Sequence, residues 1–147
     1  MTRVIGCGNL HRGDDAAGLL AARRLHELGV ASAGCSGEAL SLMDGWAGAE
    51  SVILIDAVVS GQPPGTITVW DPLAAPLPRE CFVGSTHAFG VAEAIELARV
   101  LRRLPPQLTL YGIEGARFDQ GSPPSPEVLM AVERVAQEIA QCTNPRS

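Results

Sequence analysis

The sequence predicts an α/β fold: a three-layer open twisted sheet, mostly parallel with one antiparallel strand, and with helices on both faces. Short apolar runs rich in β-branched residues alternate along the chain with segments of helical periodicity, which is typical of such sheets. The run 51–55 is apolar after its first residue, as in strands that are buried on both faces. With 147 residues, 46% of them hydrophobic and 18% charged, the chain fits a single domain over residues 1–147.

The first unit is a strand, a loop and a helix. The apolar run 4–7 predicts the strand. A loop then leads to Asp14 and Asp15, which stand where helix N-termini favour acidic side chains. Apolar residues at a spacing of 3.6 predict a helix over 17–28, which closes at Gly29.

Two short elements precede the central strand. Residues 31–35 predict a short strand, and residues 40–46 predict a short helix. The buried strand 51–55 is then expected to end at Asp56. A carboxylate at the end of so apolar a strand is costly unless it is paired, hydrogen-bonded or bound to a metal.

The second half of the chain predicts two more strands and two more helices. The alternating run 66–70 predicts a strand antiparallel to its predecessor, because the link from Asp56 is too short for a helical crossover. His87 opens a helix that two prolines stop, a strand follows at 108–113, and Ser125 caps the last helix. The inward-facing positions expected in these two helices are Val91, Ile95, Ala98 and Leu101, then Leu129, Val132, Val135, Ala136 and Ile139.

Three polar residues are expected to meet at one rim of this sheet. Ligands of open parallel sheets bind outside the carboxyl ends of the strands. Asp15 lies in the loop after the first strand, Asp56 ends the buried strand, and His87 precedes a helix on the same side. Two carboxylates and an imidazole suit a borderline divalent ion such as nickel or zinc. Each residue also has an ordinary interpretation, Asp14 or Asp15 as a helix N-cap and His87 as a capping or core-edge histidine.

The remaining histidines and the cysteines carry weaker predictions. His11 is a loop residue near the predicted cleft with a possible supporting role, whereas His26 falls on a polar helix face and is expected to be solvated. Cys7 lies near the cleft, but an apolar strand end should raise the pKa of its thiol, so no cysteine nucleophile is predicted. The cysteines have no paired spacing of a zinc or redox motif and are expected to be reduced and packed; they are Cys7, Cys35, Cys81 and Cys142.

Charge and hydropathy exclude several partners. The formal net charge is -5 and the sequence pI is about 5.1, so no basic field exists to attract nucleic acid or an anionic membrane surface. No run approaches the roughly 20 apolar residues of a membrane-spanning helix, and no export signal is visible at the N-terminus. We therefore expect a soluble cytoplasmic protein.

Three other α/β functions fit poorly. A dinucleotide fingerprint after the first strand lacks its third glycine, because His11 stands in that position. All 11 basic residues are arginine, whereas a phosphate-binding P-loop requires a lysine. A phospho-accepting receiver domain would use a similar set of acids, but it also needs a lysine where this chain has Gly112-Ile113-Glu114.

Several motifs together resemble the hydrogenase maturation protease family over nearly the whole chain. Their order and spacing, rather than any single motif, carry the resemblance. They are Gly6-Cys7-Gly8-Asn9, Asp14-Asp15-Ala16-Ala17-Gly18, Leu54-Ile55-Asp56-Ala57, Ser85-Thr86-His87-Ala88-Phe89-Gly90, the segment from Leu108 to Gly115, and Leu129 to Ala136.

The resemblance implies an endopeptidase that removes the C-terminal extension from the large-subunit precursor of a nickel-iron hydrogenase after nickel insertion. It places the family's nickel-recognising acids and histidine on Asp15, Asp56 and His87, as metal-binding and catalytic residues. The nickel is carried by the substrate, no organic cofactor is implied, and the enzyme is expected to be a monomer. The alternative function is a non-catalytic, nickel-dependent assembly chaperone for the same subunit.

Two departures from the family pattern affect the site. Many members have Glu where this chain has Asp15, which shortens the reach of the carboxylate by one methylene. Several relatives have an Asp-Gly-rich segment where this chain has Gly37-Glu38-Ala39-Leu40, so the specificity loop is expected to differ. Asp14 also matches an acidic family position, and it is expected to cap the helix.

Overall fold

The computed structural model describes residues 2–36, 38–82 and 90–143. They form one five-stranded sheet in the order β2-β1-β3-β5-β4, in which only β4 is antiparallel, to its neighbour β5. The strands are β1 (Thr2–Cys7), β2 (Ser32–Cys35), β3 (Ser51–Val58), β4 (Ile67–Trp70) and β5 (Gln107–Glu114). The α-helices are α1 (Ala17–Glu27), α2 (Ala39–Trp46), α3 (Val91–Val100) and α4 (Pro126–Thr143), and two short 3-10 helices are η1 (Gly13–Ala16) and η2 (Arg79–Phe82).

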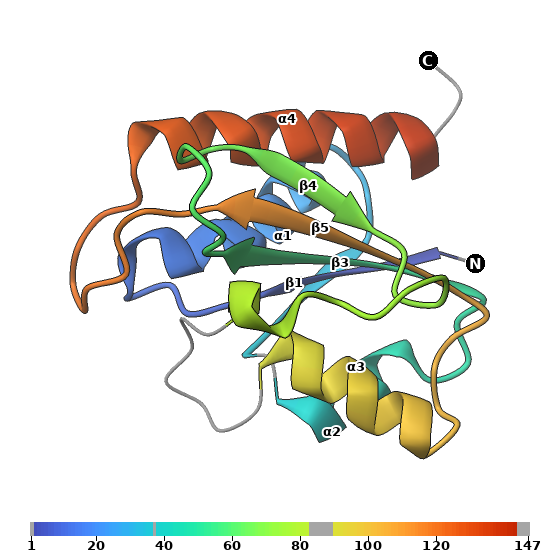
Figure 1. Ribbon diagram of the computed structural model, residues 1–147. Coiled ribbons are helices and arrows are strands. Elements are labelled where there is room, and N and C mark those ends of the chain that lie inside the picture. The colour runs from blue at the N-terminus through green and yellow to red at the C-terminus, as the bar shows by residue number, and fades with distance from the viewer. Residues whose placement is uncertain (1, 37, 83–89, 144–147) are drawn as a thin grey trace.

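The helices cover the sheet in two layers, α1 with α4 on one face and α2 with α3 on the other (Figure 1). Successive strand residues enter the two separate cores, because side chains alternate along a strand. Val4 packs with the α1 and α4 side and Ile5 with the α2 and α3 side, and Leu54 and Ile55 divide in the same way. The predicted three-layer α/β fold is therefore confirmed.

The antiparallel strand is also confirmed, but its neighbour is β5 and not β3. β4 runs opposite to β3, and β5 lies between them. A phospho-accepting receiver of the flavodoxin-like type instead has parallel strands in the order 2-1-3-4-5. The topology thus argues against the receiver interpretation independently of the missing lysine.

Asp56 does not end the central strand as predicted, because β3 continues to Val58. The ladder with β1 stops at the pair Gly6 and Ile55, whereas the ladder with β5 continues through Asp56. A polar residue does not interrupt a strand whose partner on the other side goes on pairing. Asp56 is therefore the first residue of β3 beyond the reach of β1.

Two predicted inward positions are wrong. Leu101 is 49% exposed because α3 ends one residue earlier and the chain turns at Arg102, which has a positive φ of 57°. Leu129 is 47% exposed. The buried stripe of α4 begins at Val128 and repeats at helical spacing through Ile139, which leaves Leu129 on the outer side.

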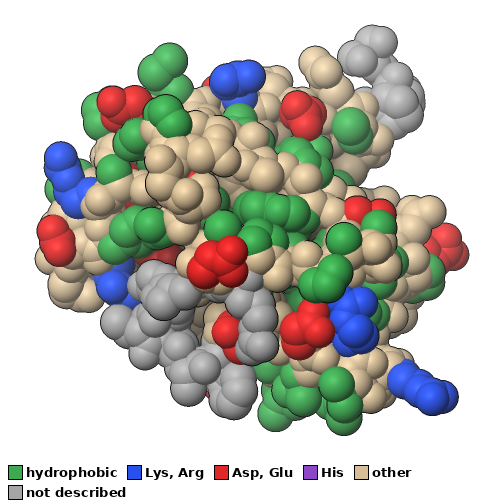
Figure 2. Space-filling view, in the orientation of Figure 1, with side chains coloured by type: hydrophobic (Ala, Val, Ile, Leu, Met, Phe, Trp, Pro, Cys, Tyr) green, Lys and Arg blue, Asp and Glu red, His purple; other side chains and the backbone are tan. Residues whose placement is uncertain are grey.

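The outer surface carries no single field of one sign in the view of Figure 2, where arginines stand singly among acidic and apolar side chains. No helix among the described residues is long and apolar enough to cross a membrane.

Two glycines let the start of α1 lie directly on the sheet. A Cβ on Gly18 would overlap the carbonyl oxygens of Cys7 and Ile55, and a Cβ on Gly6 would overlap the carbonyl oxygen of Gly18. All of these obstacles are backbone atoms, which cannot rotate away. The helix can approach β1 and β3 this closely only because both positions lack a side chain.

We predict that Gly18→Ala destabilises the protein by about 3 kcal/mol, because the added methyl group meets backbone on two strands. Gly45→Ala is the matched control, since its Cβ would lie 3.3 Å from the movable Cδ1 of Ile5 and should cost less than about 1 kcal/mol. Urea unfolding followed by circular dichroism gives both values. Equal losses in the two variants would contradict the tight approach.

Candidate active site

Asp15 is held beside the end of β1 by backbone contacts. It lies in η1, between the end of β1 and the start of α1. Its carbonyl oxygen accepts a hydrogen bond from the amide of Asn9 at 3.1 Å, and a Cβ on Gly8 would overlap the same oxygen. Gly8 has a φ of 145°, a conformation that other residues rarely adopt. The loop after β1 therefore folds back onto Asp15.

Asp56 and Asp15 interact electrostatically. Burial raises the pKa of Asp56 well above its ordinary value, and the negative charge of Asp15 raises this pKa further. The amide of Ala57 donates a hydrogen bond to Oδ1 of Asp56 at 2.9 Å, which acts in the opposite direction but is outweighed. The structure thus brings together the two predicted carboxylates, at the carboxyl-end rim of the sheet.

Cys7 is buried beside these two partly buried carboxylates. A hydrogen bond with Cys35 is the largest cause that raises the pKa of the Cys7 thiol, and burial and the charges of Asp56 and Asp15 raise it further. Cys7 and Cys35 are register partners on β1 and β2. The predicted direction of the shift is confirmed, and a thiol held neutral in this way is a poor nucleophile.

Asp14 does not cap the helix as predicted, since no side-chain cap bond is found at η1 or α1. Its buried carboxylate instead accepts four hydrogen bonds from the segment between β5 and α4. The donors are the amides of Ala116 at 2.8 Å, Arg117 at 3.0 Å and Ser125 at 2.6 Å, and the hydroxyl of Ser125 at 2.8 Å. Asp14 therefore anchors this segment against η1 and fixes the position of its neighbour Asp15.

Burial acts against the ionised form of Asp14, but the hydrogen bonds outweigh burial and lower its pKa below the ordinary value. Asp14 and Asp56 therefore differ in role. The carboxylate of Asp14 is structural and its hydrogen-bond donors satisfy it, whereas the carboxylate of Asp56 lies near the negative charge of Asp15.

Glu114 is a second buried acid that the sequence analysis did not single out as structural. Its carboxylate accepts bonds from the amide of Ser60 at 2.7 Å, the hydroxyl of Ser60 at 2.6 Å and the amide of Gly61 at 3.2 Å. It holds the loop after β3, just beyond Asp56. A glutamate that ends a strand as apolar as β5 was the available signal, by the same reasoning that selected Asp56.

The remaining predicted residues are placed as follows. His87 lies outside the described residues. The prediction that the helix opens at His87 is wrong, because α3 begins at Val91 and Gly90 before it is extended. His26 is exposed as predicted, and His11 is exposed in the loop after β1. Among the described residues, no three His, Cys, Asp or Glu side chains form a group that could hold a metal ion.

A family model described as hydrogenase maturation protease matches residues 19–142. The chain belongs to the hydrogenase maturation protease family. It is therefore a peptide hydrolase of the hydrogenase maturation type.

Solved structures of hydrogenase maturation proteases share the fold of this family member. The hydrogenase maturating endopeptidase HybD from E. coli is 22% identical, with 96% of this chain and 90% of that chain covered and a TM-score of 0.75. The NiFe hydrogenase maturation protease HycI from Thermococcus kodakarensis KOD1 is 27% identical, with 95% and 90% covered and a TM-score of 0.72. A direct comparison with curated protein sequences gave no significant match.

We predict that Asp14→Ala destabilises this maturation protease by about 3 kcal/mol at pH 7, because buried donors lose their acceptor. Ser125→Ala, which removes only the hydroxyl donor, should cost about 1 kcal/mol. Because the folded-state pKa of Asp14 is lowered, its stabilisation is present above about pH 4 and is lost as the pH falls through the folded value. Denaturant titrations should therefore show the gap between wild type and Asp14→Ala closing in acid.

We predict the opposite sign for Asp56. Its raised folded-state pKa means that the folded protein binds a proton more tightly than the unfolded chain. The corresponding stability is fully present below the unfolded value of about pH 4 and is lost as the pH rises through the folded value. Asp56→Asn should therefore melt at a higher temperature than wild type at pH 7 and at a similar temperature near about pH 4. Calorimetry at the two pH values tests this. A variant less stable than wild type at pH 7 would refute the cost that burial and the charge of Asp15 impose on ionised Asp56.

Proposed function

We propose that this maturation protease removes the C-terminal extension of the large-subunit precursor of a nickel-iron hydrogenase once nickel has been inserted. In this proposal Asp15, Asp56 and His87 recognise the nickel that the precursor carries. The observation that carries the proposal is the position of Asp56 beside Asp15 at the rim of the sheet in a peptide hydrolase, where burial and then the charge of Asp15 raise the pKa of Asp56. Perturbed acids of this kind are typical of functional sites.

A cation would relieve the repulsion between the carboxylates of Asp15 and Asp56. Two carboxylates close to one another repel, and burial strengthens the repulsion because less water screens it. A divalent ion reverses the sign of that interaction and favours both ionised forms. Carboxylates with an imidazole are a donor set suited to nickel, and this site would engage the ion only after the precursor has acquired it.

The same groups supply the chemistry of peptide hydrolysis. Binding the substrate's nickel through Asp15 and Asp56 would dock the extension so that its scissile peptide lies beside the ion, which replaces a rare encounter with a fixed geometry. The ion can polarise the scissile carbonyl or acidify a bound water. Asp15 or Asp56 would accept the proton of the attacking water.

The protein partner is the hydrogenase large-subunit precursor, and the nickel arrives with this substrate. The protease acts as a monomer in the cytoplasm and uses no organic cofactor. Asp15, one methylene shorter than the glutamate of many family members, would require a closer approach of the ion to η1.

We expect the purified chain to shorten the nickel-loaded precursor and to leave the nickel-free precursor uncut, because the ion is both the recognised feature and the electrophile. Mass spectrometry of the precursor's C-terminus measures the cut. Asp56→Ala should lower kcat/KM by about 100-fold or more. The matched control is Asp44→Ala, which removes an acid that is 77% exposed on α2 and bonded to Arg103, and should change kcat/KM less than about twofold.

Two results would contradict the proposal. Cleavage that proceeds equally without nickel would remove the recognition role of the carboxylates. Nickel-dependent binding of the precursor with no loss of mass would instead show a non-catalytic assembly chaperone.

A further inference from the structure

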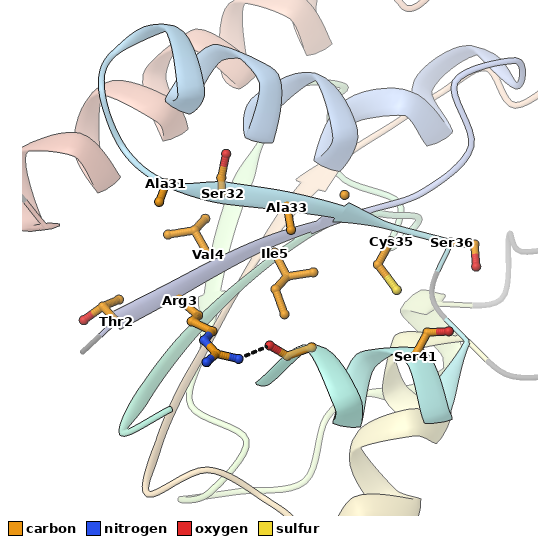
Figure 3. Close-up of a pocket in the computed structure, with 12 residues that line it drawn as sticks. Thr2, Arg3, Val4, Ile5, Ala31, Ser32, Ala33, Cys35, Ser36 and Ser41 are labelled. Carbon is orange, nitrogen blue, oxygen red and sulfur yellow. Dashed lines mark hydrogen bonds between the residues drawn. The ribbon is translucent and has the colours of Figure 1, made fainter. Parts of the chain in front are cut away.

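The edge strand β2 borders hollows on both of its faces. On the α2 side a groove of about 780 Å³ runs along β2 and β1, and its lining includes Ile5, Ala33 and Gly45 (Figure 3). On the α1 side a smaller hollow of about 270 Å³ lies between α1 and the segment 32–34. Helices α1 and α2 therefore flank β2 and leave space beside it on both faces.

The backbone of β2 presents alternate residues to the outside. The amide of Gly8 donates to the carbonyl oxygen of Cys35 at 3.0 Å, so the polar backbone groups of Cys35 face β1. In a parallel ladder every second residue faces the same neighbour, which assigns Ala33 to the β1 side as well. The amide and carbonyl groups of Ser32 and Gly34 consequently face away from the sheet.

This edge lacks the usual protection against pairing. Natural edge strands are commonly blocked by lysine, proline, an inward charge or a bulge. The segment 31–36 reads Ala-Ser-Ala-Gly-Cys-Ser, with no charge and no proline. Ala33 and Gly34 are exposed, and small side chains leave the backbone accessible. The strand is built like one that accepts a further strand.

The side chains of β2 divide between the two hollows. Ser32 donates to the carbonyl oxygen of Ala22 on α1 at 2.6 Å, and a Cβ on Gly34 would meet Leu19 of α1 at 2.8 Å. Ala33 and Cys35 point to the α2 side (Figure 3). A strand paired with β2 would likewise send alternate side chains to each side, those on the α2 side entering the larger and mostly apolar groove.

The edge leads to the candidate active site. β2 ends at Cys35, the register partner of Cys7, and the Cys7 thiol lies in the field of Asp56 and Asp15. A chain laid along β2 is thereby directed to the same rim of the sheet as the two carboxylates. This continuity indicates a polypeptide substrate rather than an unrelated partner.

We propose that β2 binds an extended segment of the precursor polypeptide as an added strand, which pairs with the outward backbone groups of Ser32 and Gly34 and places small or apolar side chains in the α2-side groove. The proposal rests on the proposed function, because it takes the precursor as the ligand. Main-chain pairing supplies affinity without demanding a sequence, and the groove limits which side chains fit.

Hydrogen exchange on the wild-type protein tests the pairing directly, with nickel-free precursor as the probe because it should bind without being cut. We expect precursor binding to slow exchange at the amides of Ser32 and Gly34 by about tenfold or more, and to leave Ala33 little changed, since its amide already faces β1. Binding without protection of Ser32 and Gly34 would overturn the proposal. Protection that instead grows with the concentration of the free protease would show that a second copy occupies the edge, and would also overturn it.

A proline substitution in β2 tests strand binding separately from catalysis. Ser32→Pro removes an outward amide while sparing the ladder with β1, but it also removes the hydroxyl that bonds Ala22, so it is measured against Ser32→Ala, which loses the hydroxyl alone. Relative to that background, Ser32→Pro should raise KM for nickel-loaded precursor about tenfold with kcat changed less than about twofold. The control on the opposite edge is Val69→Pro in β4. The carbonyl of Thr66 accepts from the amide of Glu114 on β5, so Thr66, Thr68 and Trp70 face β5 and the amide of Val69 faces outward. This opposite-edge variant should leave KM unchanged.

The outcomes distinguish this inference from the proposed function. Normal nickel-dependent cleavage with equal KM in wild type and Ser32→Pro would refute strand addition and leave the protease function standing. Protection of Ser32 and Gly34 by a precursor that is never shortened would support strand addition and refute the cleavage reaction. A thermal melt of each variant confirms that the folded protein is being compared.

Discussion

The close approach of α1 to the sheet is the constraint on which the site depends. Gly6 and Gly18 let the start of the helix lie against the backbone of β1 and β3, so no side chain separates η1 from the strand ends. Asp15 is thereby brought within electrostatic reach of Asp56, although the two residues are far apart along the chain. The interaction between the carboxylates is a consequence of this backbone contact.

Two other acids near the unfavourable pair, Asp14 and Glu114, have hydrogen-bond donors that satisfy their carboxylates. Asp14 accepts bonds from the segment before α4, and Glu114 accepts bonds from the loop after β3. These two buried carboxylates tie the segment before α4 to η1 and the loop after β3 to the end of β5. Active sites commonly retain such local costs because the surrounding structure overdetermines the geometry.

The proposed recognition has two parts with different physical origins. The carboxylates respond to the charge of an ion in the substrate and therefore report whether the ion has been inserted. The open edge of β2 responds to extended main chain, which any polypeptide offers, and its groove restricts side-chain size. Because both lie toward one rim of the sheet, a precursor that satisfies both would be held at two points, which orients a peptide bond better than either contact alone.

Periodicity and strand-end polarity are local properties of the chain, so they were enough to predict the fold class and nearly every element, and the order and spacing of the motifs were enough to predict the family. The sequence also selected Asp56, since an acid at the end of so apolar a strand requires a partner, and it placed Asp15 in the loop after the first strand on the same side of the sheet. Three features could be seen only in the folded molecule: Asp14 anchors a distant segment, β5 separates β4 from β3, and Leu101 and Leu129 face solvent. Each of these outcomes depends on which remote surface a residue meets, and local pattern does not contain that information.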